Sequence, residues 1–143
     1  EVYPSHSRSK REIVNLYLSQ EKYEDALELA KENYENRPTN IYHIHSYFIC
    51  LIRSKQGITN SVRKKLGQLK DSVKNSVDYK ADDLFRCMEG EFAYYVENDF
   101  NKANDILLEA IKINKNRSYP KKSMFAIYKA EGRENLIEDL DKF

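Results

Sequence analysis

Tryptophan is absent from this 143-residue sequence, and glycine, proline and cysteine occur only four, three and two times. Few glycines and prolines leave few positions at which the chain must break, which favours helices over a sheet with many tight turns. A chain of this length can bury about two-thirds of its unfolded surface without help from a disulfide or a metal. We therefore expect one domain over residues 1–143, held together by a hydrophobic core.

Long apolar runs are also missing. The longest strongly apolar run is Tyr47 to Ile52, whereas a membrane-spanning helix needs about 20 residues, so no membrane segment is expected. Cys50 and Cys87 both lie in apolar patterns, where a thiol usually behaves as a small buried hydrophobe. A disulfide or a reactive thiol is the alternative. Unpaired thiols of this kind indicate a reducing, cytoplasmic location. Because the chain starts at Glu1 rather than at methionine, we interpret it as a fragment of a larger protein.

Apolar residues recur along most of the chain with the i, i+3, i+4 spacing of a helix face. The stripes predict about eight helices joined by short connections, and consecutive helices are expected to pack as antiparallel pairs. One stripe, from Val62 to Val77, contains Gly67. Glycine in a helix lowers stability by up to about 1 kcal/mol relative to alanine, so we expect Gly67 to have a packing role, namely to permit a close backbone approach. The fold class is all-α, and the expected helix pairs cover residues 9–37, 41–77, 81–115 and 120–143.

The net charge of +1 is unevenly distributed. Residues 61–80 include six basic and two acidic residues, whereas residues 81–99 include six acidic residues and a single basic one, Arg86. The net charges are +4 and −5. Adjacent segments of opposite sign favour helices that attract each other, although solvated helix faces also carry such charge.

Tyr17 and Leu51 are 34 residues apart, as are Tyr94 and Tyr128, and a period of this length in paired helices is typical of helix-turn-helix repeats. The stretch from Tyr17 to Pro38, with Ala26 and Ala30, resembles the second half of a tetratricopeptide repeat. A second copy resembles it from Gly90 to Asn116, and a third, partial copy lies at Tyr128, Gly132 and Arg133. The resemblance departs from the family in two ways: tryptophan is absent, and 43 residues separate Leu51 from Tyr94.

The resemblance to tetratricopeptide repeats implies an α-α superhelix whose concave face, lined by the first helix of each pair, binds a peptide or a partner domain. That partner is another protein or another domain of the same chain, and the role is a non-catalytic scaffold or a regulatory one. A purely structural role in dimerisation is a further alternative. The candidate partner-binding residues on this face are Arg8, Arg11, Asn15, His45, Ile49, Met88, Phe92, Lys122 and Lys129.

Arg11 and Asn15 also resemble the start of a clamp with which some members of that family hold a terminal carboxylate. The later clamp positions hold Ser46, Phe85 and Glu89 here, so this ligand is not expected, because a lone cation orients a carboxylate poorly.

Residue patterns for catalysis or for a bound metal are not found. His43 and His45 are two residues apart and diverge on a helix, where a shared metal needs i, i+4 spacing. Glu89 and Glu91 diverge for the same reason, which disfavours paired-carboxylate chemistry. The sequence has no phosphate-binding glycine loop and no nucleophile motif. We therefore expect no enzyme activity, no metal and no cofactor.

Nucleic-acid binding is the alternative function. The basic segments at residues 61–80 and 115–122 could follow a phosphate backbone if the fold brought them onto one face. The 11 tyrosines could stack on bases if their rings were exposed, although most lie in helical stripes where core packing is the commoner fate.

Overall fold

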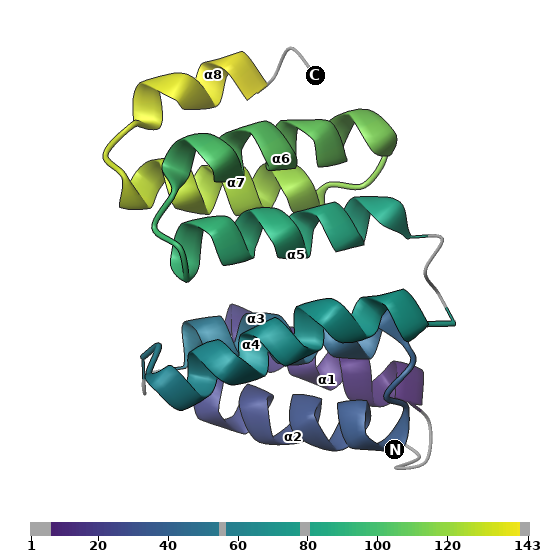
Figure 1. Ribbon diagram of the computed structural model, residues 1–143. Helices are drawn as coiled ribbons and strands as arrows, with labels where there is room; N and C mark the ends of the chain where they lie inside the picture. Colours follow the sequence, from purple (N-terminus) through teal and green to yellow (C-terminus); the bar gives the residue numbers. More distant parts are fainter. Residues whose placement is uncertain (1–6, 55–56, 78–80, 141–143) are drawn as a thin grey trace. The chain divides into compact units, whose positions relative to one another are not determined.

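The computed structural model describes residues 7–54, 57–77 and 81–140, and within these ranges every regular element is a helix (Figure 1). The chain is therefore all-α, and successive helices pack antiparallel within each part. The chain divides into two compact units, Glu1–Tyr79 and Lys80–Phe143. The expected single domain over residues 1–143 stays a prediction. None of the helices in the described ranges is long and apolar enough to cross a membrane.

The first unit contains four α-helices and one 3-10 turn. They are α1 (Ser7–Ser19), α2 (Tyr23–Asn36), α3 (Ile41–Arg53), α4 (Asn60–Ser72) and η1 (Val73–Asn75). Each α-helix packs against the next, and α1 also contacts α3. Small residues on α2 permit the close packing, since Ala26 and Ala30 are completely buried. Asn40 begins α3 by accepting hydrogen bonds from the backbone N–H groups of Tyr42 and His43.

The second unit contains three long helices and a short C-terminal segment. They are α5 (Asp82–Tyr95), α6 (Phe100–Ile113), α7 (Tyr119–Ala130), the 3-10 turn η2 (Glu134–Leu136) and α8 (Ile137–Leu140). Contacts join α5 to α6, α6 to α7, α5 to α7 and α7 to α8. The core of this unit contains Cys87, Leu107, Ala110, Ile111, Met124, Ile127, Tyr128 and Leu140.

The two helical glycines have opposite environments. A Cβ atom at Gly90 would lie 2.7 Å from Cγ of Leu107, so the absence of a side chain lets α5 and α6 approach closely. The expectation for Gly67 was wrong: nothing lies within 4 Å of a Cβ placed there. Gly67 therefore makes no close contact that requires glycine. The close approach between two helices is found at Gly90 instead.

Three turns after first helices share a left-handed residue. Glu21 has φ +58°, Asn98 has φ +57° and Gly132 has φ +71°. In the first and third turns the next backbone N–H bonds the carbonyl five residues earlier: Lys22 to Tyr17 at 2.9 Å, and Arg133 to Tyr128 at 2.8 Å. This 6→1 bond closes a helix C-terminus and satisfies a carbonyl that the helix leaves unpaired. Tyr17 and Tyr128 therefore occupy equivalent positions, in different units.

Most expected helix bounds agree with the structure to within a few residues. The exception is the end of the second pair, where α4 ends at Ser72 rather than continuing in a helical stripe to Val77. Val77 follows η1 and is 76% exposed, so its expected place in the stripe was wrong. The expected last helix is present as α8, and residues 141–143 lie outside the described part of the chain.

Candidate partner-binding site

The first helices of the first unit, α1 and α3, lie side by side and contribute Arg11 and Tyr42 to one shared contact. The guanidinium carbon of Arg11 lies 4.8 Å from the centre of the Tyr42 ring. Stacking on an aromatic face fixes the plane of a guanidinium while leaving its N–H donors available. Within the described ranges no carboxylate forms an ion pair with Arg11. Asn15, one turn further along α1, is exposed.

The other two candidates of the first unit offer little surface. His45 and Ile49 lie one turn apart on α3, and their exposed fractions are 8% and 5%. Nine of the 13 residues of α3 are buried, His43 and His45 among them, so neighbouring elements cover most of this helix. Arg8 belongs to α1, but its side chain lies outside the described part of the structure.

The candidates of the second unit differ strongly in exposure. Met88 on α5 is completely buried, and Phe92, one turn later, is half-buried. Lys122 and Lys129 on α7 are both exposed, and α7 contacts α5. The candidate residues are thus divided between the two units. A single concave face that includes all of them stays a prediction.

A buried polar cluster joins α5 to α7, and the sequence analysis missed it. Glu91 is only 1% exposed, and its Oε2 atom accepts hydrogen bonds from the Tyr119 hydroxyl at 2.5 Å and from the Ser123 hydroxyl at 3.0 Å. Two turns earlier on α5, the buried carboxylate of Asp83 forms an ion pair with Arg117. A carboxylate is acceptable in a core when such donors surround it. The only sequence signal was Glu91 within an otherwise apolar stripe.

The thiol of Cys87 lies on the same face of α5, between these two carboxylates in sequence. Burial raises the pKa of this thiol, the charges of Glu91 and Asp83 raise it further, and Arg117 opposes them. Burial also raises the pKa of Cys50 to about 12, and Arg53 opposes that shift. Both cysteines are buried and free, as expected for thiols in apolar stripes. A protonated, buried thiol is a poor nucleophile.

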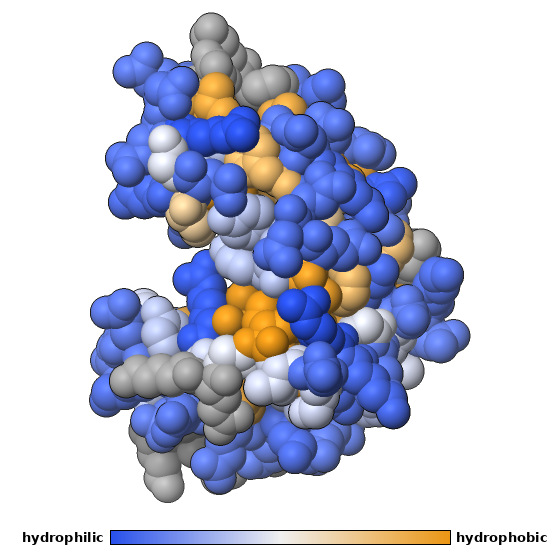
Figure 2. Space-filling view, turned by 60° about the vertical axis from the view of Figure 1, so that its left-hand side comes forward, coloured by the Kyte–Doolittle hydropathy of each residue, from blue (hydrophilic) through white to orange (hydrophobic). Residues whose placement is uncertain are grey.

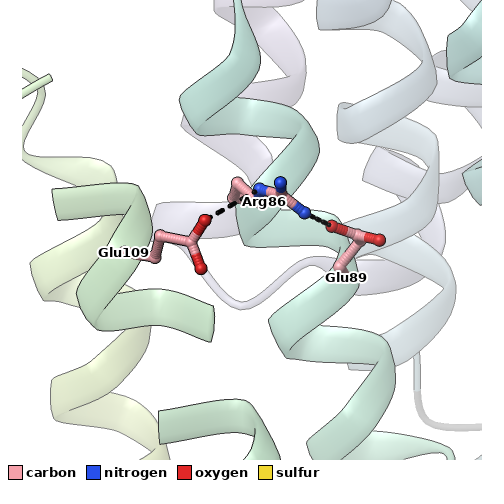
Figure 3. A network of polar contacts seen from close by, with 3 residues as sticks. All are labelled: Arg86, Glu89 and Glu109. Carbon is pink, nitrogen blue, oxygen red and sulfur yellow. Dashed lines mark hydrogen bonds and ion pairs between the residues drawn. The ribbon is translucent and has the colours of Figure 1, made fainter. Parts of the chain in front are cut away.

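At the surface of the second unit, one ion pair connects α5 to α6 and another lies within α5 (Figure 3). Arg86 lies between two glutamates: its Nη1 is 2.6 Å from Oε1 of Glu89, and its Nε is 3.6 Å from Oε1 of Glu109. Glu89 therefore lies at the surface beside a cation, whereas Glu91 is buried beside hydroxyls. The two carboxylates diverge, as their spacing of two residues predicts.

The basic residues of the alternative nucleic-acid hypothesis are partly engaged within the protein. Arg117 is held by Asp83, and the ammonium of Lys65 lies 5.7 Å from the ring centre of Tyr34 and 5.8 Å from that of Tyr47. Every tyrosine in the described ranges is half-buried or buried. These contacts reduce the surface available for phosphates and for stacked bases, and the hypothesis itself stays a prediction.

Groups able to hold a metal are also limited. Across residues 7–54, 57–77 and 81–140, no set of three or more histidine, cysteine, aspartate or glutamate side chains is arranged to bind a metal ion. His43 and His45 are both buried on α3.

Figure 2 shows a face of the molecule on which hydrophilic residues predominate.

Comparisons with known proteins assign no family: no family model, no curated protein and no solved structure matches the chain. The class of protein that the structure defines is therefore an all-α helical protein with sequential antiparallel packing. The resemblance to tetratricopeptide repeats rests on residues alone.

Proposed function

We propose that this chain is a non-catalytic helical-repeat module of the tetratricopeptide type, which binds a peptide or a partner domain through the first helices of its pairs. The packing order within each unit supports this proposal. In both units a first helix contacts its own second helix and also the next first helix: α1 contacts α2 and α3, and α5 contacts α6 and α7. Stacked helix pairs of this kind present their first helices side by side as a continuous surface.

The turns and crossings support the same proposal. Tyr17 and Tyr128 accept equivalent hydrogen bonds at the ends of first helices, and the close approach at Gly90 places a small residue where two helices of a pair meet.

The observation that carries the proposal is the contact between Arg11 and Tyr42. It joins two first helices and orients a guanidinium that no carboxylate neutralises within the described part of the chain. Stacked arginine is well suited to recognition because its donors are held in one plane before the partner arrives. Asn15, exposed one turn away, adds an amide that can both donate and accept hydrogen bonds.

The proposal is tested by affinity capture with the purified chain, followed by reconstitution with each recovered protein in purified form. Arg11→Glu and Lys122→Glu each reverse one charge on a first helix. Arg37→Glu and Lys112→Glu are matched controls, because both residues are exposed and neither lies on a first helix. Arg37 immediately follows α2, and Lys112 belongs to α6. We expect the first-helix variants to weaken binding by tenfold or more, equivalent to about 1.4 kcal/mol, and the controls to change it little.

Equal binding by all four variants would argue against a binding face on the first helices. Recovery of nucleic acid instead of protein, with affinity that falls steeply as salt is added, would replace the proposal with the nucleic-acid hypothesis.

A further inference from the structure

Gly67 is a helix-interior glycine that packing within the first unit does not explain. It lies inside α4, and no atom of the described residues lies within 4 Å of a Cβ placed there. Glycine at such a position lowers helix stability by about 1 kcal/mol relative to alanine. What glycine offers in return is a backbone that another group can approach closely. Gly67 therefore leaves space for a group that the first unit does not supply.

The other helical glycine shows what such a space accommodates. A Cβ at Gly90 would lie 2.7 Å from Cγ and 3.1 Å from Cδ2 of Leu107, so the missing side chain lets a leucine of the neighbouring helix reach the α5 backbone. Among the described residues, no side chain has the corresponding position over Gly67. The open space on α4 is thus of the kind that a leucine from another helix fills in this protein.

Cations flank Gly67 on the same side of α4. Arg63 lies four residues before Gly67 and Lys70 lies three residues after it, which places the three residues in one row along the helix. Arg63 is exposed and Lys70 is half-buried. The inward side of α4 is filled by the unit itself, because Leu66 and Leu69 are completely buried there. We call the row of Arg63, Gly67 and Lys70 the Gly67 face.

The charges around the Gly67 face indicate the kind of partner. Lys64 and Lys74 are exposed on α4 and on the following turn η1, so the surroundings add two further cations, against the single carboxylate of Asp71. Such a surface attracts a ligand of opposite net charge. Asp71 would repel a phosphate backbone but can pair with a basic side chain of a protein. An acidic protein segment therefore fits this surface better than a nucleic acid.

We propose that the Gly67 face is a docking site for an acidic amphipathic helix of a partner protein, with a leucine-sized side chain over Gly67 and carboxylates opposite Arg63 and Lys70. On the partner helix, carboxylates three and four residues from the leucine lie about 4.5 and 6 Å from it along the axis. These offsets match those of Lys70 and Arg63 from Gly67. Because α4 is a second helix, this surface is separate from the first-helix face of the proposed function.

The charge of the face is tested with the full chain and a fluorescein-labelled, alanine-rich helical peptide. The peptide has a central leucine and glutamates three and four residues to each side of it, and binding is followed by fluorescence anisotropy at low salt. Arg63→Gln/Lys74→Gln removes two cations from this surface. Lys22→Gln/Lys31→Gln is the matched control, because both lysines are exposed in the first unit and neither belongs to α4. We expect about tenfold weaker binding by the first variant and a change within about twofold for the control.

The space over Gly67 is tested separately from the charge. Gly67→Gln fills the space and adds a better helix former, so its denaturant midpoint should rise while the peptide binds about tenfold more weakly. Ser61→Gln is the matched control, since it adds the same side chain at an exposed position of α4 about 9 Å away along the axis, and it should leave binding unchanged. A peptide with alanine in place of leucine should bind more weakly to the original chain but no more weakly still to Gly67→Gln, because both changes remove one contact.

Unchanged binding by Gly67→Gln would overturn the proposal, as would equal weakening in Arg63→Gln/Lys74→Gln and its control, because general electrostatic attraction would then explain the binding. So would an absence of measurable binding to the original chain. Tighter binding of an RNA oligonucleotide of the same net charge would assign the face to nucleic acid, and a dimer lost only in Gly67→Gln would assign it to a second copy of the chain. Arg11→Glu should leave the peptide's binding unchanged, which separates a failure here from a failure of the proposed function.

Discussion

The α1–α2 pair of the first unit and the α5–α6 pair of the second form similar hairpins from different residues. Alanines at Ala26 and Ala30 provide the close packing in the first pair, whereas Gly90 facing Leu107 provides it in the second. The turn residue is Glu21 in one pair and Asn98 in the other, with nearly equal φ values. The comparison shows that the fold constrains backbone geometry and side-chain size at these positions more tightly than it constrains residue identity.

The two units also differ in what they bury. The second unit encloses the carboxylates of Asp83 and Glu91 with donors from α7 and the residues before it. In the first unit Arg11 is half-buried, and its guanidinium lies over the Tyr42 ring. A buried charge makes stability depend on its partner, whereas a half-exposed stacked arginine can be replaced at small cost. The second unit should therefore be the more sensitive to loss of a single polar side chain.

The largest effect is expected from Arg117→Ala. This change leaves the Asp83 carboxylate, 4% exposed, without its cation, and an unpaired buried charge costs about 3–5 kcal/mol. Arg117 is 29% exposed, so water reduces the loss toward the lower end of that range. Urea unfolding monitored by amide-resolved spectra should show the loss in the second unit. Arg11→Ala is the matched change in the first unit, and a loss there of similar size would remove the contrast between the units.

A smaller effect is expected at the helical glycines. Gly90→Ala places a Cβ 2.7 Å from Leu107 Cγ, and such overpacking costs about 1–3 kcal/mol. Gly67→Ala meets nothing within 4 Å and should stabilise the protein by about 0.5–1 kcal/mol, because alanine has the higher helix propensity. Denaturant midpoints of the two variants should move in opposite directions. Similar shifts for both would mean that α5 and α6 do not approach closely at Gly90.

The smallest effect is expected at the turns. Glutamate in the left-handed region is strained, whereas asparagine tolerates it, so Glu21→Gly should raise the free energy of unfolding by roughly 0.5–1 kcal/mol. Asn98→Gly should change it by only a few tenths of a kcal/mol. Thermal unfolding of both variants would measure the difference. An increase at Asn98 as large as that at Glu21 would show that the two turns are not strained differently.

The helices could be predicted from the sequence because their information is local. The apolar spacing that predicts them depends on residues within one or two turns of each other. The polar cluster could not be predicted, since Tyr119 and Ser123 lie 28 and 32 residues from Glu91. Gly67 and Gly90 illustrate the same limit. Both stand within helical stripes, and only the packing of a second helix distinguishes them.

The candidate site shows the same difference between local and long-range information. The resemblance to tetratricopeptide repeats implied which residues lie on the first helices, but their exposure depends on neighbouring helices. Lys122 and Lys129 are exposed, whereas Met88, one turn before Phe92, is completely buried. The oriented guanidinium of Arg11 depends on Tyr42, which lies in another helix pair and could not be assigned to it from spacing.

The burial of both cysteine thiols has a practical consequence. Because Cys50 and Cys87 are buried and remain protonated, maleimide reagents at neutral pH should modify only a cysteine introduced at the surface. Ser61→Cys in one unit and Lys112→Cys in the other are exposed positions that could carry a fluorophore pair without removal of either native cysteine. The unaltered cores would thus allow energy transfer between the labels to report the spacing of the units directly, with and without a partner.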